Sequence, residues 1–86
     1  MKVNREILYR KIGAKVIYFR TSKNLTQEEL AERAHMSQGT LSRIENGKYN
    51  TNLSLSLLID IADGLDINPI YLFDFLPEEQ AAWMEP

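Results

Sequence analysis

The segment from Leu25 to Lys48, LTQEELAERAHMSQGTLSRIENGK, constrains the fold of this chain more than any other feature. Thr26 and Glu29 have the spacing of a capping box, in which each side chain accepts a hydrogen bond from the other residue's backbone amide at the start of a helix. Ser37 is a favourable N-cap for a second helix, and Gly47 suits the left-handed backbone at the end of that helix. The segment therefore predicts two short helices joined by a tight turn.

The second helix of this pair is expected from about Gln38 to Asn46, and its two faces differ. Leu41 and Ile44 are three residues apart and share the inward face. The opposite face is dense in hydrogen-bonding groups, which can bond base edges in the major groove of DNA, and its glycine allows a close approach to the groove floor. The residues predicted to read bases are Gln38, Gly39, Ser42 and Arg43.

A plainer interpretation of this surface is that its polar side chains face water, as they do on many short amphipathic helices. For any single residue that interpretation is favoured. The whole pattern favours DNA reading, because the capped first helix, the short turn and the glycine end occur together with small residues, Ala31 and Ala34, at the helix crossing. A helical protein-interaction module is the alternative.

These residues resemble the helix-turn-helix domains of the phage repressor and Cro type, the XRE type. The resemblance extends over about Ile7 to Phe73. It is carried by Ile12, Gly13, Arg20, Leu25–Ala31, Ser37, Leu41, Ile44–Lys48, Ile61, Ala62 and Leu65. It implies an all-α fold, namely a five-helix lambda-repressor-like DNA-binding domain with a helix-turn-helix. It also implies a dimer that binds a partly palindromic operator in double-stranded DNA, usually as a transcriptional repressor or autoregulator.

The resemblance implies a role for individual residues as well. Gln27 matches a position that touches a phosphate and braces the recognition helix, whereas Arg20 and Glu45 match a partly buried ion pair between the first helix and the recognition helix. Gly39 departs from the family, because a side chain often reads a base at that position. The residues predicted to lie against the DNA backbone are Thr26, Gln27, Ser37, Thr40, Asn46, Lys48, Tyr49 and Asn50. For the last two, a simple turn role is the alternative.

The charged residues are divided unequally along the chain, whose net charge is -2. Residues 2–48 hold all ten Lys and Arg and five acidic residues, a net charge of +5. Residues 49–86 hold seven acidic residues and no Lys or Arg, a net charge of -7. A polyanion is attracted to the first half and repelled by the second, which would orient the chain on DNA. The alternative is ordinary variation on a solvated surface.

Apolar periodicity predicts further helices on both sides of this segment. One is expected over about residues 4–22 and another over about 54–65, where Gly64 indicates a close contact or an early end. Asn68 and Pro69 form a cap and first-turn pair that opens a fifth helix to about Phe73, and Pro77 begins a short last one. The predicted core stripes are Leu8, Ile12, Val16 and Phe19 in the first helix and Leu55, Leu58, Ile59, Ala62 and Leu65 in the fourth.

The end of the chain is unusually rich in large apolar residues, and such a surplus is often an association surface. Family members commonly dimerise through the fifth helix and the residues after it, so the resemblance points to the same place. The predicted dimer interface comprises Ile67, Ile70, Tyr71, Phe73, Phe75, Leu76 and Trp83. The alternative is that Phe75 and Trp83 fold back on the core. We divide the chain into a domain over residues 1–76 and a short helical extension over residues 77–86.

Several classes of protein fit the sequence poorly. The chain has no cysteine, and its single histidine, His35, has no second histidine or cysteine and no clustered carboxylates beside it. We therefore expect no enzyme, no metal site and no cofactor. No apolar run approaches the roughly 20 residues that cross a membrane, and the N-terminus lacks a signal-peptide core, so a cytoplasmic protein is expected.

Two functions from different classes remain. The first is a dimeric, sequence-specific DNA-binding transcriptional regulator. The second is a protein-interaction module, such as the antitoxin of a toxin-antitoxin pair or a restriction-modification controller protein, which would use the apolar C-terminal surface. The two are compatible, since antitoxins of this type frequently repress their own promoters.

Overall fold

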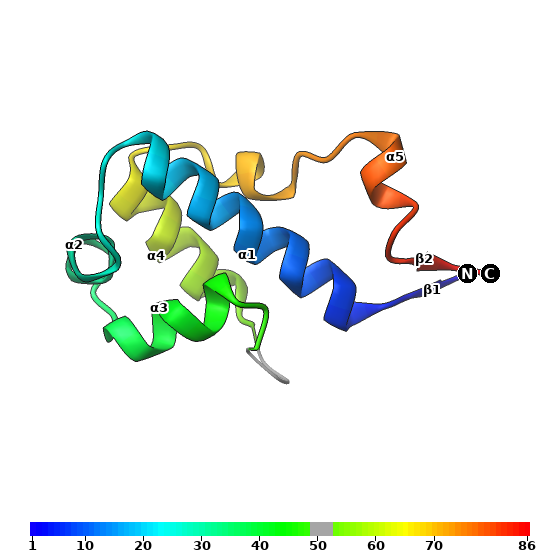
Figure 1. The fold of residues 1–86 in the computed structure, drawn as a ribbon, viewed down its shortest axis with the longest axis horizontal. Coiled ribbons are helices and arrows are strands. Elements are labelled where there is room, and N and C mark those ends of the chain that lie inside the picture. The colour runs from blue at the N-terminus through cyan, green and yellow to red at the C-terminus, as the bar shows by residue number, and fades with distance from the viewer. Residues whose placement is uncertain (49–52) are drawn as a thin grey trace.

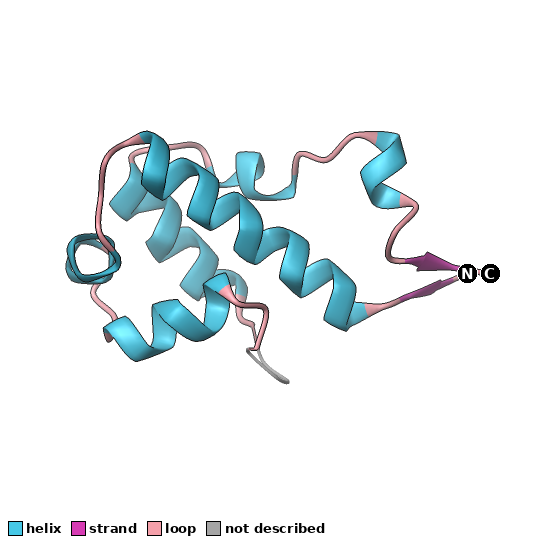
Figure 2. Ribbon diagram, in the orientation of Figure 1, coloured by secondary structure: helices cyan, strands magenta, loops and turns pink. Residues whose placement is uncertain are grey.

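The computed structural model describes residues 1–48 and 53–86, and helices dominate it (Figures 1 and 2). Tyr49 and Asn50, which the sequence predicts to contact the DNA backbone, lie outside the described residues. The elements in chain order are β1 (Lys2–Val3), α1 (Arg5–Ser22), α2 (Gln27–Arg33), α3 (Gln38–Glu45), α4 (Leu55–Leu65), the 3-10 helix η1 (Pro69–Phe73), α5 (Pro77–Gln80) and β2 (Met84–Glu85). The predicted helical fold is confirmed, with a minor pair of terminal strands added.

Side-chain caps determine where the helices begin. Thr26 accepts a hydrogen bond from the Glu29 amide at 3.1 Å, and Glu29 accepts one from the Thr26 amide at 3.0 Å, which confirms the capping box. Ser37 caps α3 as expected, and Ser54 caps α4 in the same way. These bonds satisfy amides that have no partner inside the helix, so short helices can start at defined residues.

One core lies between the helices: α1 packs against α3, α4 and η1, and α2 packs against α3 and α4. Figure 1 shows α1 crossing the molecule diagonally, with α3 below it and η1 above it. The largest fully buried side chains come from every one of these helices: Val16, Leu30, Leu41, Ile44, Ile61, Leu65 and Leu72. Among the described residues, no helix is long and apolar enough to cross a membrane.

Two details of the later helices differ from the prediction. Leu55 and Ile59 are 64% and 41% exposed, whereas Ile61 is fully buried. Leu58, Ala62 and Leu65 of the predicted stripe are buried as expected, so only the edge of the stripe differs. Apolar residues occur on more than one side of α4, and tertiary packing buried Ile61 rather than Leu55 and Ile59. The predicted fifth helix is the five-residue 3-10 helix η1, a form that proteins use in short pieces. Gly64 makes the close contact expected of it, because a Cβ there would lie 3.1 Å from the Ala34 amide nitrogen.

The two ends of the chain meet in an antiparallel ribbon that the sequence did not predict. Lys2 pairs with Glu85 and Val3 pairs with Met84. The Asn4 amide next to this ribbon donates to the Trp83 carbonyl at 2.7 Å. Strands of two residues are too short for a periodic pattern, and the paired residues come from opposite ends of the sequence. No local sequence pattern therefore predicts this pairing. The ribbon ties the C-terminal residues to the start of α1.

The predicted extension over residues 77–86 packs against the domain. Trp83 meets Phe75 edge to face, with the ring centroids 5.0 Å apart, and both side chains are buried. Lys15 on α1 lies over the Phe75 ring, 5.1 Å from its centroid. The C-terminal segment therefore covers one side of α1 within a single molecule.

Candidate nucleic-acid interface

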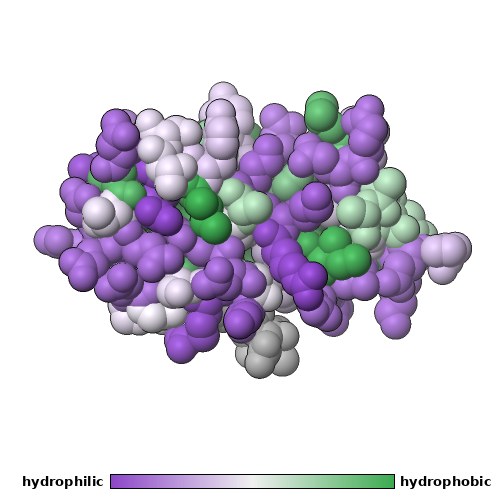
Figure 3. All heavy atoms as spheres, viewed as in Figure 1, coloured by the Kyte–Doolittle hydropathy of each residue, from purple (hydrophilic) through white to green (hydrophobic). Residues whose placement is uncertain are grey.

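Helix α3 presents a polar outer face beside a fully buried inner one. Leu41 and Ile44 are 0% and 1% exposed, so the helix cannot rotate without uncovering them. Of the residues predicted to read bases, Gln38, Gly39 and Arg43 are exposed and Ser42 is half-buried. The part of the molecule that contains α2 and α3 is mainly hydrophilic in the view of Figure 3. The structure thus presents these hydrogen-bonding groups to an external partner.

Gly39 leaves a patch of bare backbone on this face. A Cβ built at this residue has nothing within 4 Å, so the surface there is open. The absence of a side chain lets another molecule come close to the first turn of α3.

Hydroxyl groups organise the same first turn. The Ser37 side chain accepts from the Thr40 amide at 3.1 Å and donates to the Thr40 hydroxyl oxygen at 2.9 Å. The Arg43 guanidinium approaches that hydroxyl at 3.4 Å, which is a long contact for a hydrogen bond, and stays exposed. Arg43 is therefore free to exchange this contact for a stronger acceptor.

A buried ion pair holds the far end of α3 to α1. Arg20 Nε donates to Glu45 Oε2 at 2.7 Å, and Arg20 Nη2 donates to Glu45 Oε1 at 3.1 Å. Arg20 Nη1 also donates to the Leu25 carbonyl at 2.9 Å. The two side chains are only 15% and 1% exposed. A bidentate pair whose third guanidinium nitrogen is also hydrogen-bonded has a fixed geometry, so it sets the angle of α3 against the rest of the domain.

Gln27 extends this network to the surface. Its Nε2 donates to Glu45 Oε1 at 2.9 Å, and a carboxylate can only accept, so the amide oxygen of Gln27 must point away from Glu45. That oxygen faces Gln38 Nε2 at 3.5 Å. The orientation of the first exposed side chain of α3 is thereby linked to the buried carboxylate at the other end of the helix.

Gly13 on α1 is a positioning residue whose purpose the sequence did not reveal. A Cβ there would lie 2.4 Å from the Ile44 carbonyl oxygen and 2.6 Å from that of Glu45. Only a glycine allows the α1 backbone to touch the last turn of α3 this closely. The glycine appeared in the family resemblance, but local sequence carries no signal for which helix approaches it.

The capping box at the start of α2 has an electrostatic consequence. Hydrogen bonds from the backbone and then the side chain of Thr26 hold the pKa of Glu29 below its ordinary value of 4.5. Glu29 is therefore charged at neutral pH and keeps the Thr26 amide occupied.

Lys48, which the sequence predicts to contact the DNA backbone, is exposed directly after the left-handed Gly47, whose φ is +67°.

The described residues contain no group of three or more His, Cys, Asp and Glu side chains that is placed to hold a metal ion. His35 occupies the turn between α2 and α3 with a left-handed φ of 56° and is exposed. The sequence did not predict this left-handed conformation, which is uncommon for residues other than glycine.

The residues predicted to form a dimer interface divide into two groups. Ile70, Tyr71, Phe73 and Leu76 are between 44% and 64% exposed. Phe75 and Trp83 are instead buried in the monomer, which is the alternative that the sequence left open, and Ile67 is partly buried against the same core. The exposed group can reach another molecule without any change in the core.

Comparisons with known proteins agree with this geometry. The family model described as Helix-turn-helix matches residues 16–72, from the middle of α1 into η1. An uncharacterised HTH-type transcriptional regulator of Methanocaldococcus jannaschii is 38% identical over 60 residues, which are 70% of this chain and 91% of that protein. The immunity repressor protein of Bacillus phage phi105 is 32% identical over 71 residues, 83% of this chain and 49% of that protein.

A solved structure extends the likeness from sequence to fold. The restriction-modification controller protein C.AhdI from Aeromonas hydrophila superposes with a TM-score of 0.71 and 34% identity. The alignment covers 76% of this chain and 96% of that one. Nearly the whole of that controller protein therefore has a counterpart in this chain.

Proposed function

The chain belongs to the helix-turn-helix family of DNA-binding transcriptional regulators, and we propose that it acts as a dimeric repressor or autoregulator on a partly palindromic operator. The observation that carries the proposal is the exposed polar face of α3, held at a fixed angle by the buried Arg20–Glu45 pair. A similar chain is named an immunity repressor and a similar structure is named a restriction-modification controller, which supports a regulator of transcription. We propose no enzyme activity for the protein, and we propose that it acts in the cytoplasm.

In this proposal α3 lies in the major groove with its first turns toward the bases. Arg43 donates to the N7 and O6 atoms of a guanine, and Gln38 makes a two-bond contact with an adenine edge. Ser42 bonds a further base, and Gly39 allows the helix to sit deep in the groove. The residues assigned to the DNA backbone are Thr26, Gln27, Ser37, Thr40, Asn46 and Lys48.

The dimer in this proposal forms through the exposed apolar residues that begin at η1. Ile70, Tyr71, Phe73 and Leu76 leave about half or more of their surface in water in the monomer, and burying them against a second copy removes apolar surface from water. A two-fold axis through this surface would place two α3 helices about one turn of DNA apart, roughly 34 Å. The same surface would bind the partner if the chain acts as an antitoxin.

The test of base reading is the variant Arg43→Ala. We expect it to relax sequence preference at one base pair in each half-site and to cost about 1–3 kcal/mol in binding. The matched control is Lys48→Ala, which removes a charge but no base contact and should weaken binding to all sequences alike. Sequence preference is measured by titrating operator variants that differ at single positions. An unchanged preference in Arg43→Ala would remove Arg43 from the reading role.

A further inference from the structure

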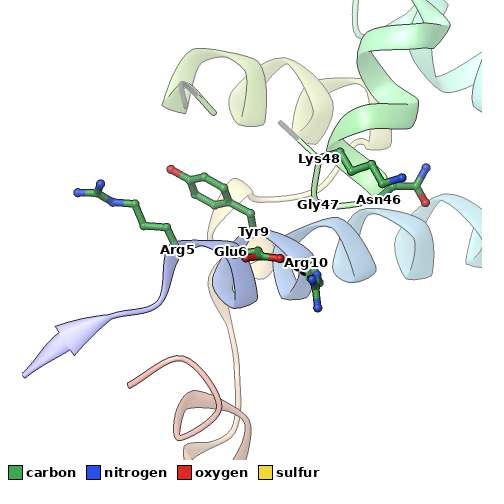
Figure 4. A pocket seen from close by; sticks show the side chains of 7 residues that line it. All are labelled: Arg5, Glu6, Tyr9, Arg10, Asn46, Gly47 and Lys48. Atoms are coloured by element: carbon green, nitrogen blue, oxygen red, sulfur yellow. Dashed lines mark hydrogen bonds and ion pairs between the residues drawn. The ribbon is translucent and has the colours of Figure 1, made fainter. Parts of the chain in front are cut away.

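A positively charged hollow lies between the first turns of α1 and the turn that follows α3. Its volume is about 320 Å³. Figure 4 shows Arg5 and Tyr9 on the first turns of α1 and Lys48 on the turn after α3, with the side chains of Arg5 and Lys48 pointing in opposite directions. Three cationic side chains, Arg5, Arg10 and Lys48, line it together with one carboxylate, Glu6. The lining therefore has a net charge of +2.

The cations of this hollow are not equally engaged. Arg10 Nη2 donates to Glu6 Oε1 at 2.6 Å, an exposed pair one helical turn apart. Within residues 1–48 and 53–86, neither Arg5 nor Lys48 has a salt-bridge partner. Both are exposed, so an external anion can reach them.

The hollow is rigidly joined to the recognition helix. Gly47 packs so closely on α1 that a Cβ there would lie 2.6 Å from Arg10 Cγ and 2.8 Å from Arg10 Cα. On its other side, Arg5 directly follows Asn4, whose side chain donates to Glu85 at 2.8 Å and whose amide donates to Trp83. The hollow therefore keeps a fixed position at the end of α3.

DNA that accepts α3 in its major groove must pass its phosphate backbone along the ends of that helix. The hollow opens next to Lys48, where the C-terminal end of α3 stops. Arg5 and Lys48 are long, exposed side chains that line the hollow, so both can turn toward a phosphate placed there, and the Tyr9 hydroxyl can donate a hydrogen bond to it. Charge, position and donor chemistry thus agree on one occupant.

We propose that Arg5 and Lys48, with Tyr9 beside them, hold a phosphate of the DNA backbone at the edge of each half-site. The first turns of α1 would then belong to the DNA-binding surface. Arg5, Tyr9 and Arg10 lie outside residues 16–72, so the match to the family model does not supply this contact. The inference rests on the proposed function, because it requires α3 to lie in the groove.

The test compares Arg5→Ala with Lys11→Ala. Lys11 lines a different hollow with Phe75 and Glu79, so this control removes one charge from the same helix on another side. For Arg5→Ala we expect weaker binding to operator and unrelated DNA alike. The slope of log Kobs against log salt should become shallower by about 0.9 for each phosphate that the variant no longer neutralises. Lys11→Ala should keep the slope of the wild type, and Arg5→Lys should keep most of it.

A second variant should act in the opposite direction. Glu6→Gln removes a carboxylate that repels a phosphate, and it releases Arg10 from the ion pair. We expect tighter binding and a steeper salt slope, an outcome that simple loss of structure cannot produce. Thermal melting followed by circular dichroism checks that all four variants fold.

The outcomes separate this inference from the proposed function. If wild type binds an operator and Arg5→Ala keeps its affinity and slope, the inference is overturned while operator binding stands. If Arg5→Ala and Lys11→Ala lose the same slope, the effect is one of total charge and the inference is again overturned. If wild type shows no preference for any DNA sequence, the proposed function fails and the inference fails with it.

Discussion

The helix-turn-helix segment and the C-terminal segment expose opposite kinds of surface. In α2 and α3 the large apolar side chains are buried, with Leu30 and Leu41 at 0% exposure, and polar groups face outward. From η1 onward, Leu72 is buried while its neighbours Tyr71 and Phe73 are 49% and 44% exposed. Figure 1 shows α3 and η1 on opposite sides of α1.

This difference indicates two separate partners. A polar, donor-rich surface suits a polyanion, whereas an apolar surface that the monomer leaves open suits a second protein surface. Because the two surfaces lie on opposite sides of α1, both can be occupied at once. The proposed DNA contact and the proposed dimer can therefore form at the same time.

The largest effect on stability is expected for Glu45→Ala, in the buried ion pair behind α3. The variant leaves the nearly buried Arg20 charge without its carboxylate and frees Gln27 from its acceptor, which should lower the free energy of unfolding by about 4 kcal/mol. Urea unfolding measures this loss of stability. The control Glu6→Ala removes the exposed pair with Arg10 and should cost less than about 0.5 kcal/mol. Equal losses in the two variants would mean that the buried pair does not hold α3.

The next effect separates the two parts of the C-terminal surface. Trp83→Ala opens a cavity beside Phe75 and should lower the free energy of unfolding by about 3 kcal/mol at any protein concentration. Ile70→Ala shortens a side chain that is 64% exposed, so it should leave the monomer's stability nearly unchanged and weaken self-association. Urea unfolding and sedimentation equilibrium measure the two quantities. Dissociation of a dimer by Trp83→Ala without loss of stability would reverse these assignments.

The same contrast explains which features the sequence predicted. Thr26, Ser37 and Gly47 act on backbone groups within a few residues, so the sequence predicted the paired helices closely. Trp83 is positioned by contacts with Phe75 and with the start of the chain, and hydrophobicity alone did not distinguish folding back from association. The terminal strand pair, the exposed Ile59 of α4 and the 3-10 form of η1 likewise depend on tertiary packing.

Substitutions at two glycines test the contact between α1 and α3 and the open surface at the start of α3. Gly13→Ala forces a methyl group against the carbonyls of α3 and should cost about 2 kcal/mol, although alanine is normally the better helix residue. Gly39→Ala meets no neighbour and should stabilise the protein by up to about 1 kcal/mol. Thermal melting gives the sign of each change. A stabilising Gly13→Ala would contradict the close contact between α1 and α3.

The smallest effect is a pH dependence at the capping box. The pKa of Glu29 is lower in the folded protein than its ordinary value of 4.5, so its contribution to stability is present above 4.5 and is lost as pH falls through the folded value. Glu29→Gln keeps a side chain that can accept from the Thr26 amide but cannot titrate. We therefore expect the difference in Tm between wild type and Glu29→Gln to shrink as pH falls from about 6 to about 3.

The control for this pH series is Glu28→Gln, which changes the exposed neighbour outside the capping box. Its difference from wild type should vary less with pH than that of Glu29→Gln. A Glu29→Gln difference that stays constant across the series would show that the capping carboxylate does not contribute as its hydrogen bonds indicate.

The most direct test of a dimeric operator reader is selection of binding sites from random duplex DNA, followed by titration of the selected site at several salt concentrations. We expect an inverted repeat with half-site centres about one helical turn apart, roughly 34 Å, and a strong linear dependence of log Kobs on log salt. Failure to enrich any sequence, with only weak and salt-sensitive binding left, would contradict a dimeric operator reader. The helix-turn-helix would then be a scaffold, and the exposed apolar surface around η1 would be the functional one.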